Sequence, residues 1–164
     1  PLKQFLLNPQ FRHIFDFVKN EYENTTCFPP RQLIFNAFQR TSFDKLKVVM
    51  LGNDPYSLLN EANGLAYSVS KAAKCPHILQ NMYKALEKDP KVNFKPPSPL
   101  HGDLKSWANQ GILMLNNNLS VREDYNYSHA RSGWDKFTKA VVNAINKEKD
   151  GVIFLCWVDS KRKY

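Results

Sequence analysis

The sequence has few cysteines and no long hydrophobic run. Its three cysteines, Cys27, Cys75 and Cys156, lie far apart, and none forms a CxxC pair. An odd number of widely spaced cysteines favours reduced thiols over a disulfide framework. With only four scattered histidines, the sequence predicts no zinc site. No apolar segment approaches the ~20 residues that a membrane-spanning helix needs.

The sequence also lacks the usual signals of targeting and of nucleotide binding. The first residues do not contain the long apolar core of a signal peptide, so we expect an intracellular protein. That means the cytoplasm in a prokaryote, and the nucleus or an organelle in a eukaryote. Neither GxGxxG nor GxxxxGK[ST] occurs among its six glycines. This absence counts against an α/β protein that binds a nucleotide through a phosphate loop.

Basic residues are in clear excess over acidic ones. The 164 residues contain 23 Lys and Arg against 15 Asp and Glu, a formal net charge of +8. Such an excess favours a polyanionic partner, although solubility alone also accounts for surface charge. The length fits one domain, 1–164, without an internal boundary.

Short apolar runs alternate with segments of helical spacing. We expect helices over 11–22, 31–40, 78–87, 104–108 and 134–146, where apolar residues recur every three or four positions. The runs 46–51, 112–115 and 152–157 are typical of buried strands, and the third of them places Cys156 in the core. Strands separated by helices predict βαβ units and a parallel sheet.

Polar residues follow each predicted strand. Asp54 comes after the first strand, Asn116 after the second, and residues 157–160 after the third. In open α/β sheets the ligand lies beyond the carboxyl ends of the strands. Asp54 and Asn116 could each simply close a turn. Alternatively, the carboxylate could stabilise a developing cation, and the amide could read the edge of a base.

The aromatic and histidine candidates have similar alternatives. Tyr56 and Tyr67 are either core aromatics or flat walls against a base. His77 and His129 are either ordinary surface histidines or contacts to phosphate.

The segment 48–69, VVMLGNDPYSLLNEANGLAYSV, resembles the water-activating segment of family 1 uracil-DNA glycosylases. That family usually has GQDPYH, a short linker, HGL and an aromatic residue before Ser-Val, and the spacing agrees without a gap. Further motifs extend the resemblance from about Phe28 to Trp157 in the same order. The resemblance implies a three-layer α/β/α fold with a central parallel sheet, and excision of uracil from DNA for base excision repair.

The resemblance also implies roles for individual residues. Asp54 is similar to the catalytic carboxylate, and Tyr56 to the tyrosine that crowds the C5 position of the base. Tyr67 occupies the base-stacking position, and Asn116 that of the asparagine that reads the uracil edge. Asn53 stands where the family usually has Gln, within the substrate-binding segment.

Other positions are expected at the DNA. Ser57 is one of them and replaces the histidine that follows Pro-Tyr. Asn63 replaces the histidine of HGL, a departure from the family pattern to which no DNA contact is assigned. Pro76 and His77 fall where the family has a Pro-Pro-Ser loop that pinches the DNA backbone. His129 belongs to a matching Ser-His motif and is expected at phosphate.

The family's HPSPLS segment and its last strand do not occur in the 164 residues, so we expect the C-terminal strand of the domain to be missing. This keeps open a second possibility, a catalytically weakened DNA-binding module of the same fold. No metal or organic cofactor is implied. The expected partner is uracil-containing DNA, bound by a monomer away from membranes. Whether a proteinaceous glycosylase inhibitor or a replication protein also binds is left open.

Overall fold

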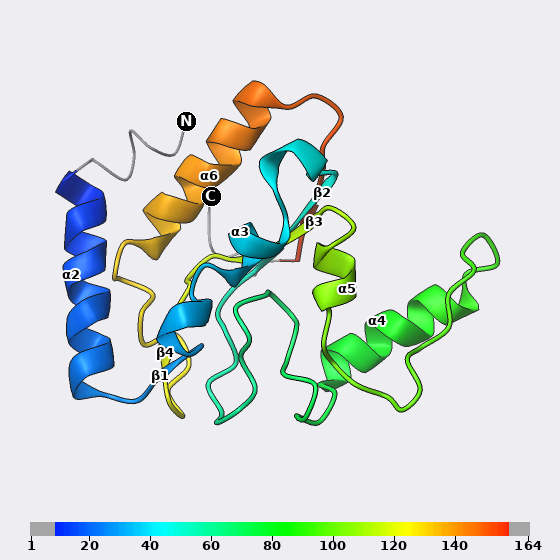
Figure 1. Ribbon diagram of the computed structural model, residues 1–164, viewed down its shortest axis with the longest axis horizontal. Coiled ribbons are helices and arrows are strands. Elements are labelled where there is room, and N and C mark those ends of the chain that lie inside the picture. The colour runs from blue at the N-terminus through cyan, green and yellow to red at the C-terminus, as the bar shows by residue number, and fades with distance from the viewer. Residues whose placement is uncertain (1–8, 158–164) are drawn as a thin grey trace.

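The centre of the molecule is a parallel sheet of three strands (Figure 1). The structure is a computed structural model that describes residues 9–157. The strand order is β3–β2–β5, with β2 at Val48–Gly52, β3 at Ile112–Asn116 and β5 at Ile153–Cys156. All three predicted apolar runs are therefore strands, and their parallel pairing is confirmed.

Helices cover both faces of this sheet. They are α2 (Pro9–Asn24), α3 (Asn36–Arg40), α4 (His77–Lys88), α5 (Lys105–Ala108) and α6 (Trp134–Glu148). In Figure 1, α2 and α6 lie on one side of the strands, and α4 and α5 lie on the other. This arrangement confirms the three-layer α/β/α fold. No helix within residues 9–157 is both long and apolar enough to cross a membrane.

The core forms because the central strand is apolar on both faces. Val49 is fully buried, and every residue of β2 and β3 after the first one of each strand is buried. On α6, Phe137, Val141 and Ile145 recur at four-residue spacing, so they form one buried stripe against the sheet. Two faces covered by apolar side chains explain why β2 has no polar alternation.

A second, two-stranded sheet was not predicted. Strand β1 (Cys27–Phe28) pairs antiparallel with β4 (Val121–Arg122), and Cys27 lies opposite Arg122. Two-residue strands carry too little periodicity to be recognised in a sequence. This small sheet joins the end of α2 to the segment that follows β3.

Two predictions of local structure were wrong. The helix expected over 31–40 is broken into a 3-10 turn, Arg31–Leu33, and α3. The break coincides with the close approach of Gly64, where a Cβ would lie within 1.9 Å of the carbonyl oxygen of Leu33. Cys156 is exposed rather than buried. In the described sheet β5 is an outer strand, so its apolar run is not enclosed as that of β2 is.

Candidate active site

The pairing between β2 and β3 continues beyond the ends of both strands. Gly52 lies opposite Asn116, and the main-chain N–H of Asn117 then donates to the Gly52 carbonyl at 2.8 Å. The N–H of Asn118 donates to the Asn53 carbonyl at 2.9 Å. Residues 52–54 and 116–118 are therefore held side by side, as the parallel topology predicted for Asp54 and Asn116. Of the third segment, residues 157–160, the part from 158 to 160 lies outside the described residues.

Asn116 is fixed at the end of β3. Its residue is only 6% exposed, and its side-chain oxygen lies so close to Gly52 that a Cβ there would come within 2.4 Å. The buried hydroxyl of Thr138, on α6, donates to the carbonyls of Asn116 and Asn117 at 3.2 and 3.0 Å. A carboxamide held this way presents one donor and one acceptor in a fixed direction.

The carboxylate of Asp54 accepts a hydrogen bond from a neutral amide. The Nδ2 of Asn118 donates to Asp54 Oδ1 at 2.5 Å. Buried side-chain oxygens of Asn53, Asn117 and Asn118 have no hydrogen-bond donor among residues 9–157. Most buried polar atoms in proteins are satisfied, so several unsatisfied acceptors in one place indicate a functional site.

Tyr67 lies over the same edge of the sheet. Its hydroxyl donates to the carbonyl of Leu51 at 2.9 Å and lies 3.2 Å from the carbonyl oxygen of Trp157. The rings of Tyr67 and Trp157 meet edge to face, with centroids 5.9 Å apart. The backbone of Tyr67 has φ 64°, which non-glycine residues seldom adopt and which is enriched at functional sites.

Tyr56 is half-buried against a small apolar cluster of Phe28, Ala62 and Val121. Burial raises the pKa of its phenol to about 12, so the hydroxyl stays neutral at ordinary pH. A neutral aromatic side chain that follows Asp54 by two residues suits the predicted wall against the base.

The side chains of Ser57 and Asn63 form hydrogen bonds to other loop residues. The hydroxyl of Ser57 donates to Asn126 Oδ1 at 2.9 Å, and the residue is buried. This position contradicts the predicted contact of Ser57 with DNA, because its one hydroxyl hydrogen is used inside the protein. Asn63 is also buried, and its amide donates to Ser68 Oγ and the Val69 carbonyl.

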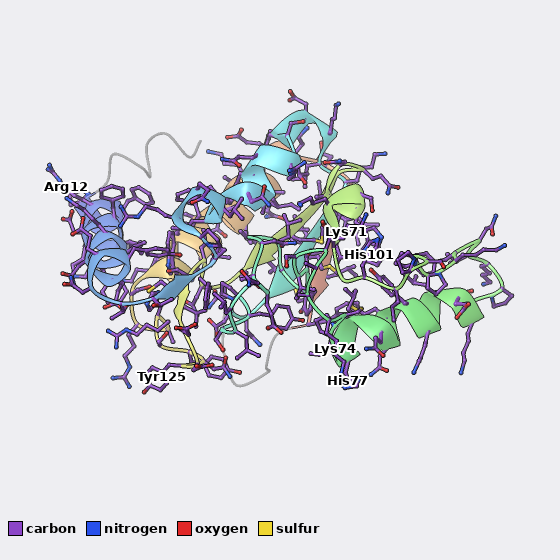
Figure 2. The ribbon with its side chains drawn as sticks, turned by 60° about the horizontal axis from the view of Figure 1, so that its bottom comes forward. Arg12, Lys71, Lys74, His77, His101 and Tyr125 are labelled. Carbon is purple, nitrogen blue, oxygen red and sulfur yellow. The ribbon has the colours of Figure 1, made fainter. Side chains whose placement is uncertain are left out.

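Pro76 and His77 stand at the beginning of α4. Pro76 precedes the first turn, and His77 is exposed. Figure 2 shows Lys74 and His77 projecting from the same edge of the molecule as Tyr125. The predicted DNA contacts at Pro76 and His77 stay predictions. The location suits them, since a helix N-terminus favours anions.

His129 is not at the surface. It is 1% exposed, its Nδ1 lies 2.8 Å from Ser120 Oγ, and its Nε2 lies 3.1 Å from Glu21 Oε2. Both ring nitrogens therefore have partners inside the protein, which contradicts the predicted contact with phosphate. The sequence could not reveal this, because Glu21 is 108 residues away along the chain.

The surroundings of His129 form a buried network. The indole N–H of Trp134 donates to Ser120 Oγ at 2.8 Å. At the other end, Arg122 donates to both carboxylate oxygens of Glu21. Burial lowers the pKa of His129, which favours the neutral ring. The Arg122 hydrogen bonds lower the pKa of Glu21, so the carboxylate is charged.

Potential metal ligands meet in this network. Ligand atoms of Glu21, Cys27 and His129 lie within 4.8 Å of one another, which their spacing in the sequence does not indicate. Because the Glu21 carboxylate already binds Arg122 and His129, these contacts account for the cluster and we assign no metal to it.

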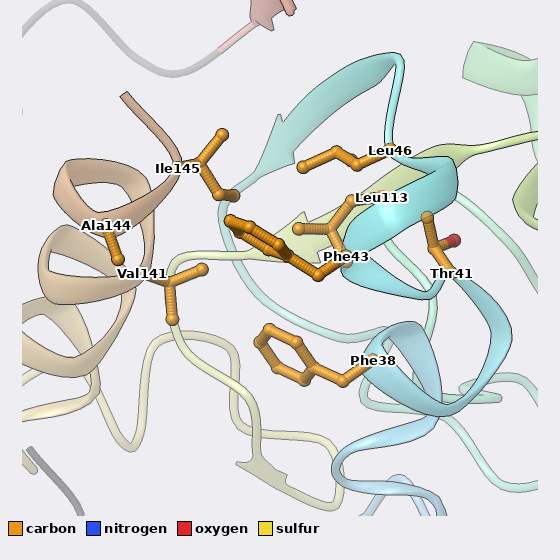
Figure 3. A pocket seen from close by; sticks show the side chains of 8 residues that line it. All are labelled: Phe38, Thr41, Phe43, Leu46, Leu113, Val141, Ala144 and Ile145. Carbon is orange, nitrogen blue, oxygen red and sulfur yellow. The ribbon is translucent and has the colours of Figure 1, made fainter. Parts of the chain in front are cut away.

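An apolar cavity lies at the other end of the strands. It has a volume of about 270 Å³ and is enclosed by side chains from the α3 region, the strands and α6 (Figure 3): Phe38, Thr41, Phe43, Leu46, Leu113, Val141, Ala144 and Ile145. Leu46 precedes β2 and Leu113 is near the start of β3, so this cavity is remote from Asn116. It contains no group for hydrolytic chemistry.

Comparisons with known proteins agree with the fold. No family model matches the chain. The curated uracil-DNA glycosylase of Amoebophilus asiaticus is 41% identical over 162 residues, which cover 99% of this chain and 72% of that protein. The enzyme of the same name from Flavobacterium johnsoniae is 42% identical over 156 residues, covering 95% of this chain and 69% of the relative.

Solved structures give the same assignment. The crystal structure of mimivirus uracil-DNA glycosylase superposes with a TM-score of 0.75 at 27% identity, covering 100% of this chain and 68% of that one. A mimivirus variant, UNG Y322L in complex with UGI, gives a TM-score of 0.76 at 28% identity and covers 98% of this chain and 69% of its own. On the strength of the curated relatives, supported by this structural likeness, the chain belongs to the uracil-DNA glycosylase family.

Proposed function

We propose that this chain hydrolyses the N-glycosidic bond between uracil and deoxyribose in DNA, as a family 1 enzyme of base excision repair. The observation that carries the proposal is the in-register pairing of β2 and β3, with Gly52 opposite Asn116. This pairing holds the loop of Asp54 next to the fixed carboxamide of Asn116. Removal of one kind of base from DNA requires an amide that recognises the base and a carboxylate that stabilises the sugar cation.

Selection of uracil follows from the hydrogen-bonding edge. Asn116 would donate to O4 of uracil and accept from its N3–H. Cytosine presents a donor and an acceptor in the opposite order, so it would leave buried polar groups unpaired. Thymine has the same edge as uracil, but its C5 methyl group would meet Tyr56. Tyr67 would stack on the face of the base.

Cleavage follows from charge. The target nucleotide must leave the helix, since its glycosidic bond is out of reach within a stacked duplex. As the bond breaks, the sugar gains positive charge at C1′ and uracil leaves with the bonding electrons. The Asp54 carboxylate stabilises that positive charge and guides water to C1′. The hydroxyl of water forms the new bond, and its proton balances the charge of the departing uracil.

DNA would be held chiefly through its phosphates. The formal net charge of +8 fits such contacts, as do the exposed side chains of Lys74, just before α4, and His77, its first residue. Binding of this kind depends little on sequence and weakens steeply between 50 and 200 mM salt.

The alternative function is a DNA-binding module with weak catalysis. It is favoured by Ser57, whose hydroxyl is bonded to Asn126. The two functions differ in one measurement, the release of free uracil from a uracil-containing single strand. A module would bind the strand with a steep salt dependence and release nothing.

The test pairs the unsubstituted chain with Asn116→Asp. The unsubstituted chain should release uracil and leave cytosine and thymine intact. The variant loses the amide donor at O4, so uracil release should fall about 100-fold or more, and any new activity should be on cytosine. Equal uracil release by both proteins would remove Asn116 from base recognition. Added UGI, the partner in the mimivirus complex, should suppress the release if this chain shares that surface.

A further inference from the structure

The hydrogen bond from Asn118 to Asp54 gives Asn118 a part in the proposed reaction. The amide donates to Asp54 Oδ1 at 2.5 Å, and the residue is 1% exposed. We propose that Asn118 is a positioning residue, which holds the Asp54 carboxylate ionised and aimed at the sugar. This inference rests on the proposed function, because it concerns the same site.

The contact follows from the topology. Asp54 lies two residues beyond Gly52, and Asn118 lies two residues beyond Asn116. Gly52 and Asn116 are paired, and the backbone bends just beyond them, at residues 53, 117 and 118. The main-chain N–H groups of Asn117 and Asn118 donate to the carbonyls of Gly52 and Asn53, so the two bends are held against each other. The backbone therefore brings Asp54 and Asn118 close enough for their side chains to bond.

The chemistry of an amide suits this task. An N–H that donates to a carboxylate favours the ionised form, and such charge-assisted bonds are short and directional. A lysine or arginine in this place would also neutralise the charge that must stabilise the sugar. An asparagine orients Asp54 without adding a positive charge.

The burial of Asn118 supports the assignment. A buried amide is costly unless its polar atoms are bonded. The Nδ2 of Asn118 donates to Asp54, while its Oδ1 has no donor among residues 9–157, so the bond to Asp54 is the contact that offsets its burial. Thr138 already ties the carbonyls of Asn116 and Asn117 to α6, so the path of the chain there has its own anchor. An apolar side chain at position 118 would then preserve the path of the loop and lose only the donor.

Three variants test the proposal: Asn118→Leu, Asn118→Asp and, as the control, Asn36→Leu. Asn36 is a buried asparagine of α3, outside the candidate site, and its amide donates to the Asn63 carbonyl at 2.7 Å. Asn118→Leu should lower kcat for uracil release about tenfold or more, with KM for DNA and the melting temperature nearly unchanged. The control should keep kcat. A fall in melting temperature without a fall in kcat would reduce Asn118 to a structural residue.

Asn118→Asp supplies a rescue that depends on pH. As the pH falls, the introduced carboxyl takes up a proton and can donate to Asp54 as the amide does, with one negative charge kept by the pair. Its kcat relative to that of the unsubstituted chain should therefore rise toward acidic pH. Tyr56 does not interfere, because burial raises its pKa to about 12. A ratio independent of pH would overturn the proposal, even if Asn118→Leu failed to fold.

A measurement without catalysis separates this inference from the proposed function. The ¹³C carboxyl resonance of Asp54, assigned with Asp54→Asn, can be titrated in the unsubstituted chain and in both variants. Loss of the donor should move the midpoint of that titration to higher pH in Asn118→Leu. If the unsubstituted chain releases no uracil and the midpoint still moves, the proposed function fails and the positioning stands. If uracil is released and the midpoint stays, only the positioning fails.

Discussion

Two shielded carboxylates of this molecule are held in opposite ways. Glu21 is buried between Arg122, which donates to both of its oxygens, and the N–H of His129. Asp54 accepts a hydrogen bond from the neutral amide of Asn118. A carboxylate bound by a guanidinium has its charge balanced within the protein, whereas an amide orients a charge without balancing it. We infer from this difference a structural role for Glu21 and, under the proposed function, a chemical role for Asp54.

The position of each carboxylate supports this division. Glu21 joins α2 to the small sheet of β1 and β4, through Arg122 of β4. Asp54 follows the central strand at the carboxyl edge of the main sheet, where ligands bind in α/β folds. Neutralising each carboxylate in turn therefore tests whether one substitution lowers only activity and the other only stability.

The largest expected effect is that of Asp54→Asn. The variant keeps the size and the hydrogen-bond acceptor of the side chain but removes the charge that stabilises the sugar cation. Uracil release should fall about 100-fold or more, while DNA binding and the melting temperature change little. Single-turnover uracil release and thermal unfolding measure the two quantities. Equal rates for the two proteins would make Asp54 a turn residue and would break the comparison.

Glu21→Gln should have the opposite outcome. The amide keeps the shape of the side chain but leaves the Arg122 guanidinium without its counter-charge. The free energy of unfolding should fall by about 2 kcal/mol, a loss of several degrees in melting temperature. Well below that temperature, the rate of uracil release should be close to that of the unsubstituted chain. If activity fell while stability was kept, Glu21 would belong to the active site.

The pH dependence of stability sharpens the description of the Glu21 network. Burial lowers the pKa of His129 in the folded state below its ordinary 6.5, so the unfolded chain binds its proton first. Stability should therefore decline as the pH falls below 6.5, by up to about 1.4 kcal/mol per pH unit for this one group. Glu21, whose folded pKa is lowered from 4.5, adds stability that is present above 4.5 and is lost as the pH falls through its folded value.

His129→Gln isolates the part of the histidine. The substitution removes the titrating ring, so the decline of stability just below pH 6.5 should become shallower. Denaturant unfolding at a series of pH values gives the slope directly. The same slope in both proteins would mean that His129 binds its proton equally in the folded and unfolded states.

Much of the active site could be predicted from the sequence because its geometry is local to two strands. The apolar runs before Asp54 and Asn116 predict parallel strands, and the carboxyl ends of parallel strands meet at one edge. The contact between Asn118 and Asp54 lies beyond the strands, where the backbone bends and strand periodicity no longer applies. The run of three asparagines after β3 was the available signal for that contact.

The Glu21 network could not be predicted in this way. Its members come from α2, β4 and the loop before α6, and 101 residues separate Glu21 from Arg122. Neither β1 nor β4 is long enough to show a period. His129 was consequently expected at DNA phosphate, whereas tertiary packing places it in the interior. The exposure of Cys156 has a similar origin, because an apolar run does not show whether its strand is central or outer.

The smallest expected effect concerns Tyr67, which lies at the same edge as Asp54 but has no charge to contribute. Its hydroxyl donates to the Leu51 carbonyl, and the proposed stacking on uracil uses only its ring. Tyr67→Phe should cost about 1 kcal/mol of unfolding free energy, the net contribution of one neutral hydrogen bond. It should leave kcat for uracil release nearly unchanged.

Tyr67→Ala removes the ring as well and should raise KM or lower kcat much further, since stacking on a base contributes about 1–3 kcal/mol. A loss of activity in Tyr67→Phe as large as that in Tyr67→Ala would assign the hydroxyl, and not the ring, to the reaction. In that case Asp54 would no longer be the one polar side chain at this edge that takes part in the reaction, and Tyr67 would do more than shape the site.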